Sequence, residues 1–213
     1  MSDIDCHNKE ENGPCILSEK GERTMEKIKE NAVIDAIMNR SSIRAYTPEK
    51  LEKEEIECLK KVALASPTAR NMQHLRYVFI TNEKIIADIE NATLDAIYAE
   101  ENKQTLEKIH SRKEKILYDT PLFVVIFGKV IRYGDVDAGI AAENLAIAAQ
   151  GMGLGSVILG MPKAAFLGEK GEKLKKSLGI ADELEYKIGI AIGHPATEKT
   201  PHTWDESHII TVE

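Results

Sequence analysis

The sequence has few of the features that mark nucleic-acid-binding or membrane proteins. It carries 28 lysines and arginines against 35 aspartates and glutamates, and the resulting net charge of −7 is the opposite of the basic excess that nucleic acid attracts. No stretch approaches the roughly 20 consecutive apolar residues that span a membrane. Residues 1–15 are acidic and polar, unlike the basic start and apolar core of a secretory signal. We therefore expect a cytoplasmic protein whose partners include neither nucleic acid nor a membrane.

Cysteine is also scarce. The three cysteines, Cys6, Cys15 and Cys58, form no C-x-x-C pair and have no histidine at zinc-finger spacing. We expect no metal site and free thiols, which is the ordinary state in a reducing compartment. The alternative is a bond between Cys6 and Cys15, which would leave one cysteine unpaired.

Motifs of several common enzyme mechanisms are missing too. There is no G-x-S-x-G element, and no serine, histidine and aspartate follow the order of a hydrolase triad. His74 and His202 are isolated in the sequence, and His194 precedes a proline in an expected turn. The glycines of residues 151–156 (GMGLGS) lack the G-x-G-x-x-G spacing of a dinucleotide-binding loop, and they follow a helical pattern instead of a strand. We therefore expect neither a hydrolase nor a Rossmann site.

The pattern of apolar residues divides the chain into an extension and one domain. Residues 1–24 lack apolar periodicity and are rich in charge, so we expect a flexible N-terminal extension followed by a folded domain over residues 25–213. Helical and strand patterns then alternate without a regular βαβ rhythm, which predicts an α+β fold with a mixed sheet layered by helices. The expected helices cover residues 25–40, 48–66, 83–119, 135–151 and 169–177, and the expected strands cover 77–80, 122–127, 156–159 and 186–192, with a possible strand at 208–212.

Two arginines follow the first expected helix. If the chain becomes extended near Arg40, alternate side chains share a face, and Arg40, Ser42 and Arg44 point the same way. Two guanidinium groups at such close range repel each other unless an anion joins them, and a phosphate accepts paired, charge-assisted hydrogen bonds from arginine. The alternative is a solvated helix end, where the arginines interact with the helix dipole and Ser41 breaks the helix.

Residues 65–73 (ASPTARNMQ) form an expected loop between a helix and a strand, where a rigid scaffold often places functional groups. Asn71 and Gln73 are two residues apart, so both carboxamides can face one side. Each offers a donor and an acceptor, which matches the alternating edge of a uracil-like ring. The alternative is a turn in which Asn71 bonds its own backbone.

Residues 135–151 are rich in alanine and almost uncharged after Asp137, apart from Glu143. An apolar helix with small side chains packs closely on several sides, so we expect a central or interface helix. We interpret Glu143 as half of a structural ion pair, with a general base as the alternative.

Four segments together resemble the FMN-binding nitroreductase family, and their order extends over nearly the whole chain from about residue 26. They are R-S-S-I-R at residues 40–44, A-S-P-T-A-R-N-M-Q at 65–73, D-A-G-I-A-A-E-N-L-A-I-A-A-Q-G-M-G-L-G-S-V-I-L-G at 137–160 and I-G-H-P at 192–195. The resemblance implies a mostly antiparallel sheet layered by helices, in an intertwined homodimer with FMN at the interface. It also implies that residues around 90–115 form a substrate-covering excursion and that the C-terminal tail reaches onto the partner subunit.

The resemblance further implies which residues hold the cofactor. The phosphate and ribityl end of FMN is expected at Arg40, Ser41, Ser42 and Arg44. The isoalloxazine ring is expected along Pro67, Thr68 and Asn71, with Asn71 at its polar edge, and under Ile158, Leu159 and Gly160 near the reactive nitrogen N5. The sequence departs from the family at His74, where proline is usual, and near its C-terminus, where only Lys199 or His202 is available for a further phosphate contact.

The implied activity is NADH- or NADPH-dependent reduction of a small-molecule electron acceptor, such as a nitroaromatic or a quinone, in a ping-pong cycle that needs no catalytic side chain. The alternatives are other flavin chemistry on the same scaffold, such as dehalogenation or enone reduction, and a flavin-binding or regulatory protein with little turnover.

Overall fold

The computed structural model describes residues 31–213. The predicted extension over residues 1–24, the start of the first expected helix, and Cys6 and Cys15 lie outside the described residues. Among residues 31–213, no helix is long and apolar enough to cross a membrane.

A four-stranded sheet forms the centre of the fold. Its strands are β1 (Arg76–Ile80), β2 (Leu122–Gly128), β3 (Gly155–Leu159) and β4 (Glu185–Gly193), in the order β1-β2-β4-β3. Every neighbouring pair is antiparallel. The predicted α+β class with a mostly antiparallel sheet is therefore confirmed, and a parallel bridge joins Ser42 to Ser156 of β3.

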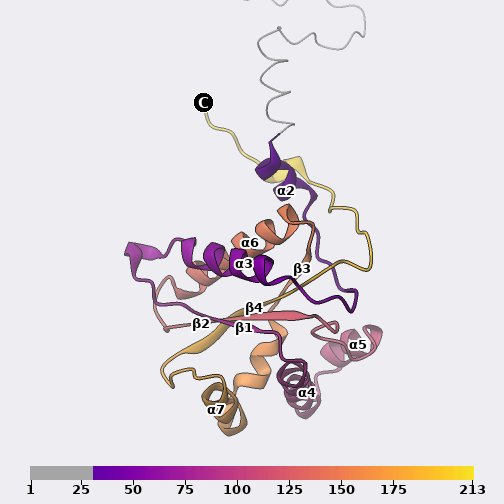
Figure 1. The fold of residues 1–213 in the computed structure, drawn as a ribbon, viewed down its shortest axis with the longest axis vertical. Coiled ribbons are helices and arrows are strands. Elements are labelled where there is room, and N and C mark those ends of the chain that lie inside the picture. Colours follow the sequence, from indigo (N-terminus) through magenta and orange to yellow (C-terminus); the bar gives the residue numbers. More distant parts are fainter. Residues whose placement is uncertain (1–30) are drawn as a thin grey trace, which may run out of the picture.

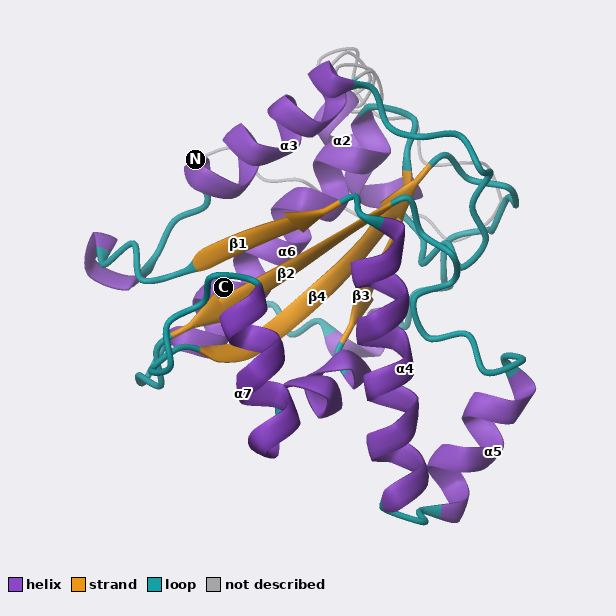
Figure 2. Cartoon of the chain, turned by 60° about the horizontal axis from the view of Figure 1, so that its bottom comes forward, coloured by secondary structure: helices purple, strands orange, loops and turns teal. Residues whose placement is uncertain are grey.

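Helices cover both faces of the sheet (Figures 1 and 2). The central strand β2 is buried along its whole length, because alternate side chains enter different cores. Leu122, Val124 and Ile126 pack toward α3 and α6, whereas Phe123 and Val125 pack toward α4 and the turn η2. The first layer holds α2 (Ala32–Asn39), α3 (Lys53–Ala65) and α6 (Gly134–Gly151), and the second holds α4 (Glu83–Ala99), α5 (Lys103–Ser111), η2 (Met161–Phe166) and α7 (Gly168–Ser177).

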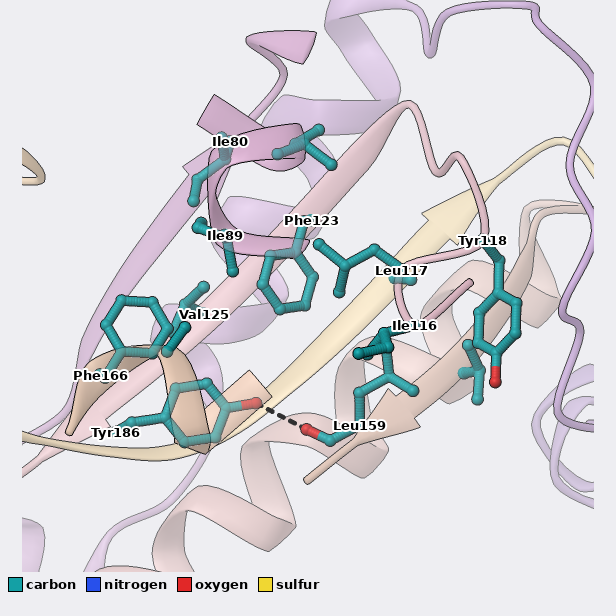
Figure 3. Packing of buried hydrophobic residues seen from close by; sticks show 14 of the residues in the cluster. Ile80, Ile89, Ile116, Leu117, Tyr118, Phe123, Val125, Leu159, Phe166 and Tyr186 are labelled. Atoms are coloured by element: carbon teal, nitrogen blue, oxygen red, sulfur yellow. Dashed lines mark hydrogen bonds between the residues drawn. The ribbon is translucent and has the colours of Figure 1, made fainter. Parts of the chain in front are cut away.

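Tyr186 is a buried tyrosine in the core between the sheet and the second helical layer (Figure 3). The ring of Tyr186 stacks on Phe166, with centroids 5.3 Å apart, and lies edge-on to Phe127. Its hydroxyl donates a 2.6 Å hydrogen bond to the carbonyl of Leu159 at the end of β3. Burial raises the pKa of Tyr186, so the hydroxyl stays protonated and able to donate. This contact fixes the end of β3 and therefore the position of Gly160 after it.

Three expected elements differ from the observed ones. The second helix begins at Lys53 and not at Pro48, because Glu52 and Glu55 form a capping box at its first turn. The helical pattern of residues 83–119 divides into α4 and α5, followed by turns that include left-handed backbone at Tyr118 and Asp119.

The prediction of a strand at residues 208–212 is wrong. The tail forms only the short turn η3 (Glu206–His208), and the residues after it have no regular structure. An alternating apolar pattern makes a strand only where a neighbouring strand accepts its hydrogen bonds, and within the described chain this segment pairs with none.

Candidate functional site

The segment of residues 40–44 has the alternating geometry expected from its sequence. Helix α2 ends at Asn39, and the backbone becomes extended at Arg40, with φ −59° and ψ 131°. Ser41 and Ile43 are buried, whereas Ser42 is half-buried and Arg44 is exposed. The side chains that carry charge therefore face away from the core, next to one hydroxyl.

This segment lies against the beginning of β3, the edge strand of the sheet. The amide of Ile43 donates to the carbonyl of Ser156 at 2.9 Å, and Ser42 forms the parallel bridge with the same residue. The close approach requires Gly155, because a Cβ there would lie 2.9 Å from Cβ and Cγ2 of Ile43. Behind the segment, Tyr46 Oη lies 2.9 Å from the carbonyl of Ile43 and 3.1 Å from that of Ala191, and its burial raises its pKa.

The two arginines have different surroundings. Arg40 Nε lies 3.5 Å from Glu143 Oε1 on α6, which confirms the interpretation of Glu143 as half of an ion pair. Arg44 is exposed, and its Nη1 is 3.5 Å from the carbonyl of Ser42, at the limit of a hydrogen bond. One short segment thus carries a half-buried guanidinium held by α6 and an exposed one, which together are a donor set suited to a phosphate.

The loop after α3 is held in an unusual shape. Arg70, Asn71 and Gln73 all have positive φ, at 55°, 52° and 46°. The two carboxamides face one side, as expected, and they are bonded to each other: Gln73 Nε2 donates to Asn71 Oδ1 at 3.0 Å. Thr68 Oγ1 accepts from the amide of Gln73 at 2.9 Å, which closes the turn.

His74, which looked isolated in the sequence, is part of a buried pair. Its Nε2 lies 2.9 Å from Asp137 Oδ2, and the two side chains are 2% and 4% exposed. The same carboxylate accepts the amide of Ala69 at 3.0 and 3.2 Å. The partners are 63 residues apart in the chain, so no local pattern could have found the pair. A cavity of about 340 Å³ lies beside it, lined by Pro67, Thr68, Ala69, Tyr133, Val136, Asp137 and Ile140.

Residues 158–160 lie where β3 ends. Ile158 is half-buried, Leu159 is buried, and Gly160 is exposed with nothing within 4 Å of the position of a Cβ. The space next to Gly160, just after the edge strand β3, is therefore not filled by other residues of the described chain. Lys199 and His202 are exposed on the C-terminal tail, and their contact with a phosphate stays a prediction.

The structure separates the predicted site residues into two groups. The contact between Ala69 and Asp137 lies in the first turn of α6, whereas the bridge between Ser42 and Ser156 lies beyond its last turn. Helix α6 contains 18 residues, which corresponds to a length of about 27 Å. Figure 1 shows the loop after α3 at one end of the helical layer, with the segment after α2 and β3 at the other. One chain therefore does not bring residues 67–71 to residues 40–44.

With this geometry established, the chain can be compared with known proteins. Residues 37–194 match the Nitroreductase family, and the chain belongs to it. The resemblance expected from the four segments is confirmed.

Individual relatives agree with this assignment. The chain is 27% identical over 179 residues to an FMN reductase (NADPH) of Bacillus subtilis (strain 168), across 78% of this chain and 67% of that protein. It is 24% identical over 165 residues to an NADPH-flavin oxidoreductase of Vibrio harveyi, across 78% of this chain and 66% of that protein. The crystal structure of a nitroreductase with bound FMN from Desulfitobacterium hafniense DCB-2 has a TM-score of 0.82 and 26% identity, and covers 86% of this chain and 99% of that chain.

Proposed function

We propose that this protein is an FMN-dependent oxidoreductase that takes electrons from NADH or NADPH and reduces nitroaromatics, quinones or related small acceptors. The observation that carries the proposal is the extended segment with Arg40 and Arg44 that lies against the beginning of β3, in a chain of the Nitroreductase family. The relatives that act on flavins with NADPH support the choice of cofactor and electron donor.

The residues along β3 fit FMN in size and chemistry. Arg40, Ser42 and Arg44 offer guanidinium and hydroxyl donors to the phosphate and the ribityl hydroxyls. Ser41 is buried between them, so it contributes to the proposed clamp by its place in the segment and not by an exposed hydroxyl. From this clamp, the chain from Ser156 to Leu159 at the end of β3 extends for roughly 10 Å. The flavin ring then lies over residues 158–160, where the absence of a side chain on Gly160 leaves room for a flat ring and for a backbone N–H near N5.

A second copy of the chain completes the site. The Arg40 clamp and the Asn71 loop lie at opposite ends of α6, and a ribityl chain is much shorter than this helix. We therefore place Pro67 of the partner subunit, Thr68 of the partner subunit and Asn71 of the partner subunit along the ring, with FMN at the interface of a homodimer.

Exposed apolar surface supports this assembly. Several large apolar side chains on α2 and on the first half of α6 are between 38% and 61% exposed, as expected of surface that a partner covers. They are Val33, Ile34, Ile37, Met38, Val136 and Ile140. On the tail, Ile209, Ile210 and Val212 are even more exposed, so the tail also offers apolar side chains to a partner. We propose an intertwined dimer for this reason.

Bound FMN supplies hydride transfer and one-electron chemistry, which side chains do not provide. The protein's part is to hold the phosphate, present the ring and leave one face open, so NAD(P)H and then the acceptor occupy the same place in turn. Such a ping-pong cycle needs no acid or base from the chain. Cys58 is a free, exposed thiol, in keeping with the cytoplasmic location that we propose.

The test is to reconstitute the purified protein with FMN, record the visible spectrum, and add NADH or NADPH without oxygen. We expect retained yellow colour, bleaching by at least one nicotinamide, recovery on addition of a nitroaromatic or quinone, and parallel lines in double-reciprocal initial-rate plots. A protein that takes up no FMN would refute the flavin function. A yellow protein that neither nicotinamide bleaches would instead support a flavin-binding or regulatory role, and bleaching without recovery by these acceptors would direct the search to dehalogenation or enone reduction.

A further inference from the structure

The buried pair of His74 and Asp137 joins three parts of the fold. His74 lies two residues before β1, and Asp137 lies in the first turn of α6, where the helix dipole favours a carboxylate. The Asp137 carboxylate accepts hydrogen bonds from the amide of Ala69, and its Oδ2 is also within hydrogen-bond distance of His74 Nε2. Several hydrogen-bond donors offset the cost of burying a carboxylate. Removal of one donor leaves part of the carboxylate buried without a hydrogen bond, which is unfavourable.

The surrounding backbone leaves room for the imidazole. A Cβ on Gly128, at the end of β2, would lie 3.3 Å from His74 Nδ1, and a Cβ on Gly134, at the start of α6, would lie 3.7 Å from His74 Cε1. The ring therefore packs between the end of a central strand and the beginning of the interface helix. This position makes His74 sensitive to any shift between the two elements.

The pair acts on the part of the chain that carries Asn71. Ala69, whose amide is bound by Asp137, is followed by Arg70 and Asn71, both with positive φ. Such backbone is unfavourable for Arg70, where it persists only because neighbouring contacts enforce it, whereas asparagine adopts it more readily. The contacts that enforce it are the Asp137 carboxylate at the start of the turn and Thr68 Oγ1 across it.

We propose that His74 is a positioning residue for the flavin ring. It orients the Asp137 carboxylate, which holds Ala69 and with it the turn that presents the Asn71 carboxamide to the pyrimidine edge of the flavin in the partner subunit's clamp. This role rests on the proposed function, and it assigns an effect on flavin binding to a residue that does not itself contact the cofactor. The effect of His74 is confined to the ring end of that FMN, because its phosphate is held by the clamp of the other subunit, and the clamp of the subunit that carries His74 lies beyond the far end of α6.

The experiment compares FMN with riboflavin, which has the same ring and no phosphate. The variants are His74→Leu, which removes the donor, and His74→Gln, whose amide nitrogen reaches the place of the imidazole Nε2. Arg44→Ala serves as the phosphate-end control. Dissociation constants come from quenching of flavin fluorescence, and the visible spectrum of the bound flavin reports the environment of the ring.

We expect His74→Leu to weaken FMN and riboflavin by the same factor, roughly tenfold or more, with a shifted flavin spectrum. His74→Gln should restore most of the affinity and the wild-type spectrum. Arg44→Ala should weaken FMN and leave riboflavin unchanged.

A purely structural role gives a different result: His74→Leu would lower the melting temperature, while the folded protein would bind both flavins with wild-type affinity and spectrum. That result, or a loss confined to FMN, would overturn the inference. If His74→Leu does not fold, Asp137→Asn replaces it, because asparagine keeps the shape and one oxygen acceptor. The expected result is again an equal loss of affinity for FMN and riboflavin, with a shifted flavin spectrum. Wild-type protein that binds neither flavin would refute the proposed function itself, whereas wild-type binding with unaltered variants refutes the positioning role alone.

Discussion

Arg40 of the segment after α2 and Glu143 of α6 form an ion pair, with Nε and Oε1 3.5 Å apart. Their side chains are 20% and 47% exposed, so the pair lies at the border between the fold and the solvent. Glu143 thereby directs one cation of the proposed clamp without neutralising the other, because Arg44 lies farther along the extended chain. The pair links α6 to the segment of the proposed phosphate clamp.

Replacement of Glu143 by glutamine should therefore change little in stability. A partly exposed ion pair contributes at most about 1 kcal/mol to the free energy of unfolding. The turnover rate at saturating NAD(P)H should not fall by the roughly hundredfold or more that accompanies loss of a general base. Thermal unfolding and steady-state kinetics measure the two quantities, and a collapse of turnover in Glu143→Gln with FMN still bound would revive the alternative of a general base.

The double change Arg40→Ala, Arg44→Ala should release FMN. Each charge-assisted hydrogen bond contributes about 1.5–3 kcal/mol, so loss of both arginines should raise the dissociation constant by roughly a hundredfold or more. Equilibrium dialysis against FMN gives the value. Lys84→Ala is the matched control, because Lys84 lies on α4 in a surface pair with Asp88 and should not affect binding. Equal FMN affinity in the double variant and the wild type would exclude the clamp.

Gly155→Ala should separate the clamp from β3. The new methyl group would lie 2.9 Å from Ile43, and such overpacking costs about 1–3 kcal/mol of stability. Because Ile43 lies between Ser42 and Arg44, FMN affinity should fall in the same variant. The control is Gly151→Ala, where a Cβ meets nothing within 4 Å. Thermal unfolding and flavin titration should distinguish the two glycines, and identical behaviour would mean that the contact with Ile43 is unimportant.

Tyr186→Phe should destabilise the fold and loosen the end of β3. The change leaves the carbonyl of Leu159 without the 2.6 Å hydrogen bond in a buried site, at a cost of about 1–3 kcal/mol. Tyr98→Phe removes the exposed hydroxyl that donates to Glu114 and should stay within about 0.5 kcal/mol of wild type. Denaturant unfolding compares the two, and an equal effect would show that the bond from Tyr186 adds nothing to stability.

The sequence predicted the elements whose periodicity reflects burial within one chain. Strand β2 and helix α6 were found within one residue of their observed bounds, because both are packed on several sides and their patterns are strong. The strand predicted at residues 208–212 is absent, since a strand needs a neighbour as well as a pattern. A local pattern does not contain that information.

The sequence predicted which segments contribute to the candidate site, but it did not predict how these segments are arranged in space. The exposure pattern around Ser41 and Ile43 follows from extended backbone alone, so alternation was sufficient there. The pair of His74 and Asp137 joins residues far apart in the chain, and the turn before it depends on positive φ at Arg70, which the preferences of arginine do not predict. The separation of the two groups of site residues appears only once α6 is placed between them.

Complementation between two defective chains tests the shared flavin site most directly. One chain carries Arg40→Ala and Arg44→Ala, the other Thr68→Ala and Asn71→Ala, and two different affinity tags allow the heterodimer to be isolated after co-expression. If each site uses the clamp of one chain and the loop of the other, the heterodimer has one site with both defects and one intact site. We predict that each homodimer is nearly inactive and that the heterodimer oxidises NAD(P)H at about half the wild-type rate per dimer. A heterodimer as inactive as the two homodimers would contradict the account, because it would place clamp and loop in the same subunit's site.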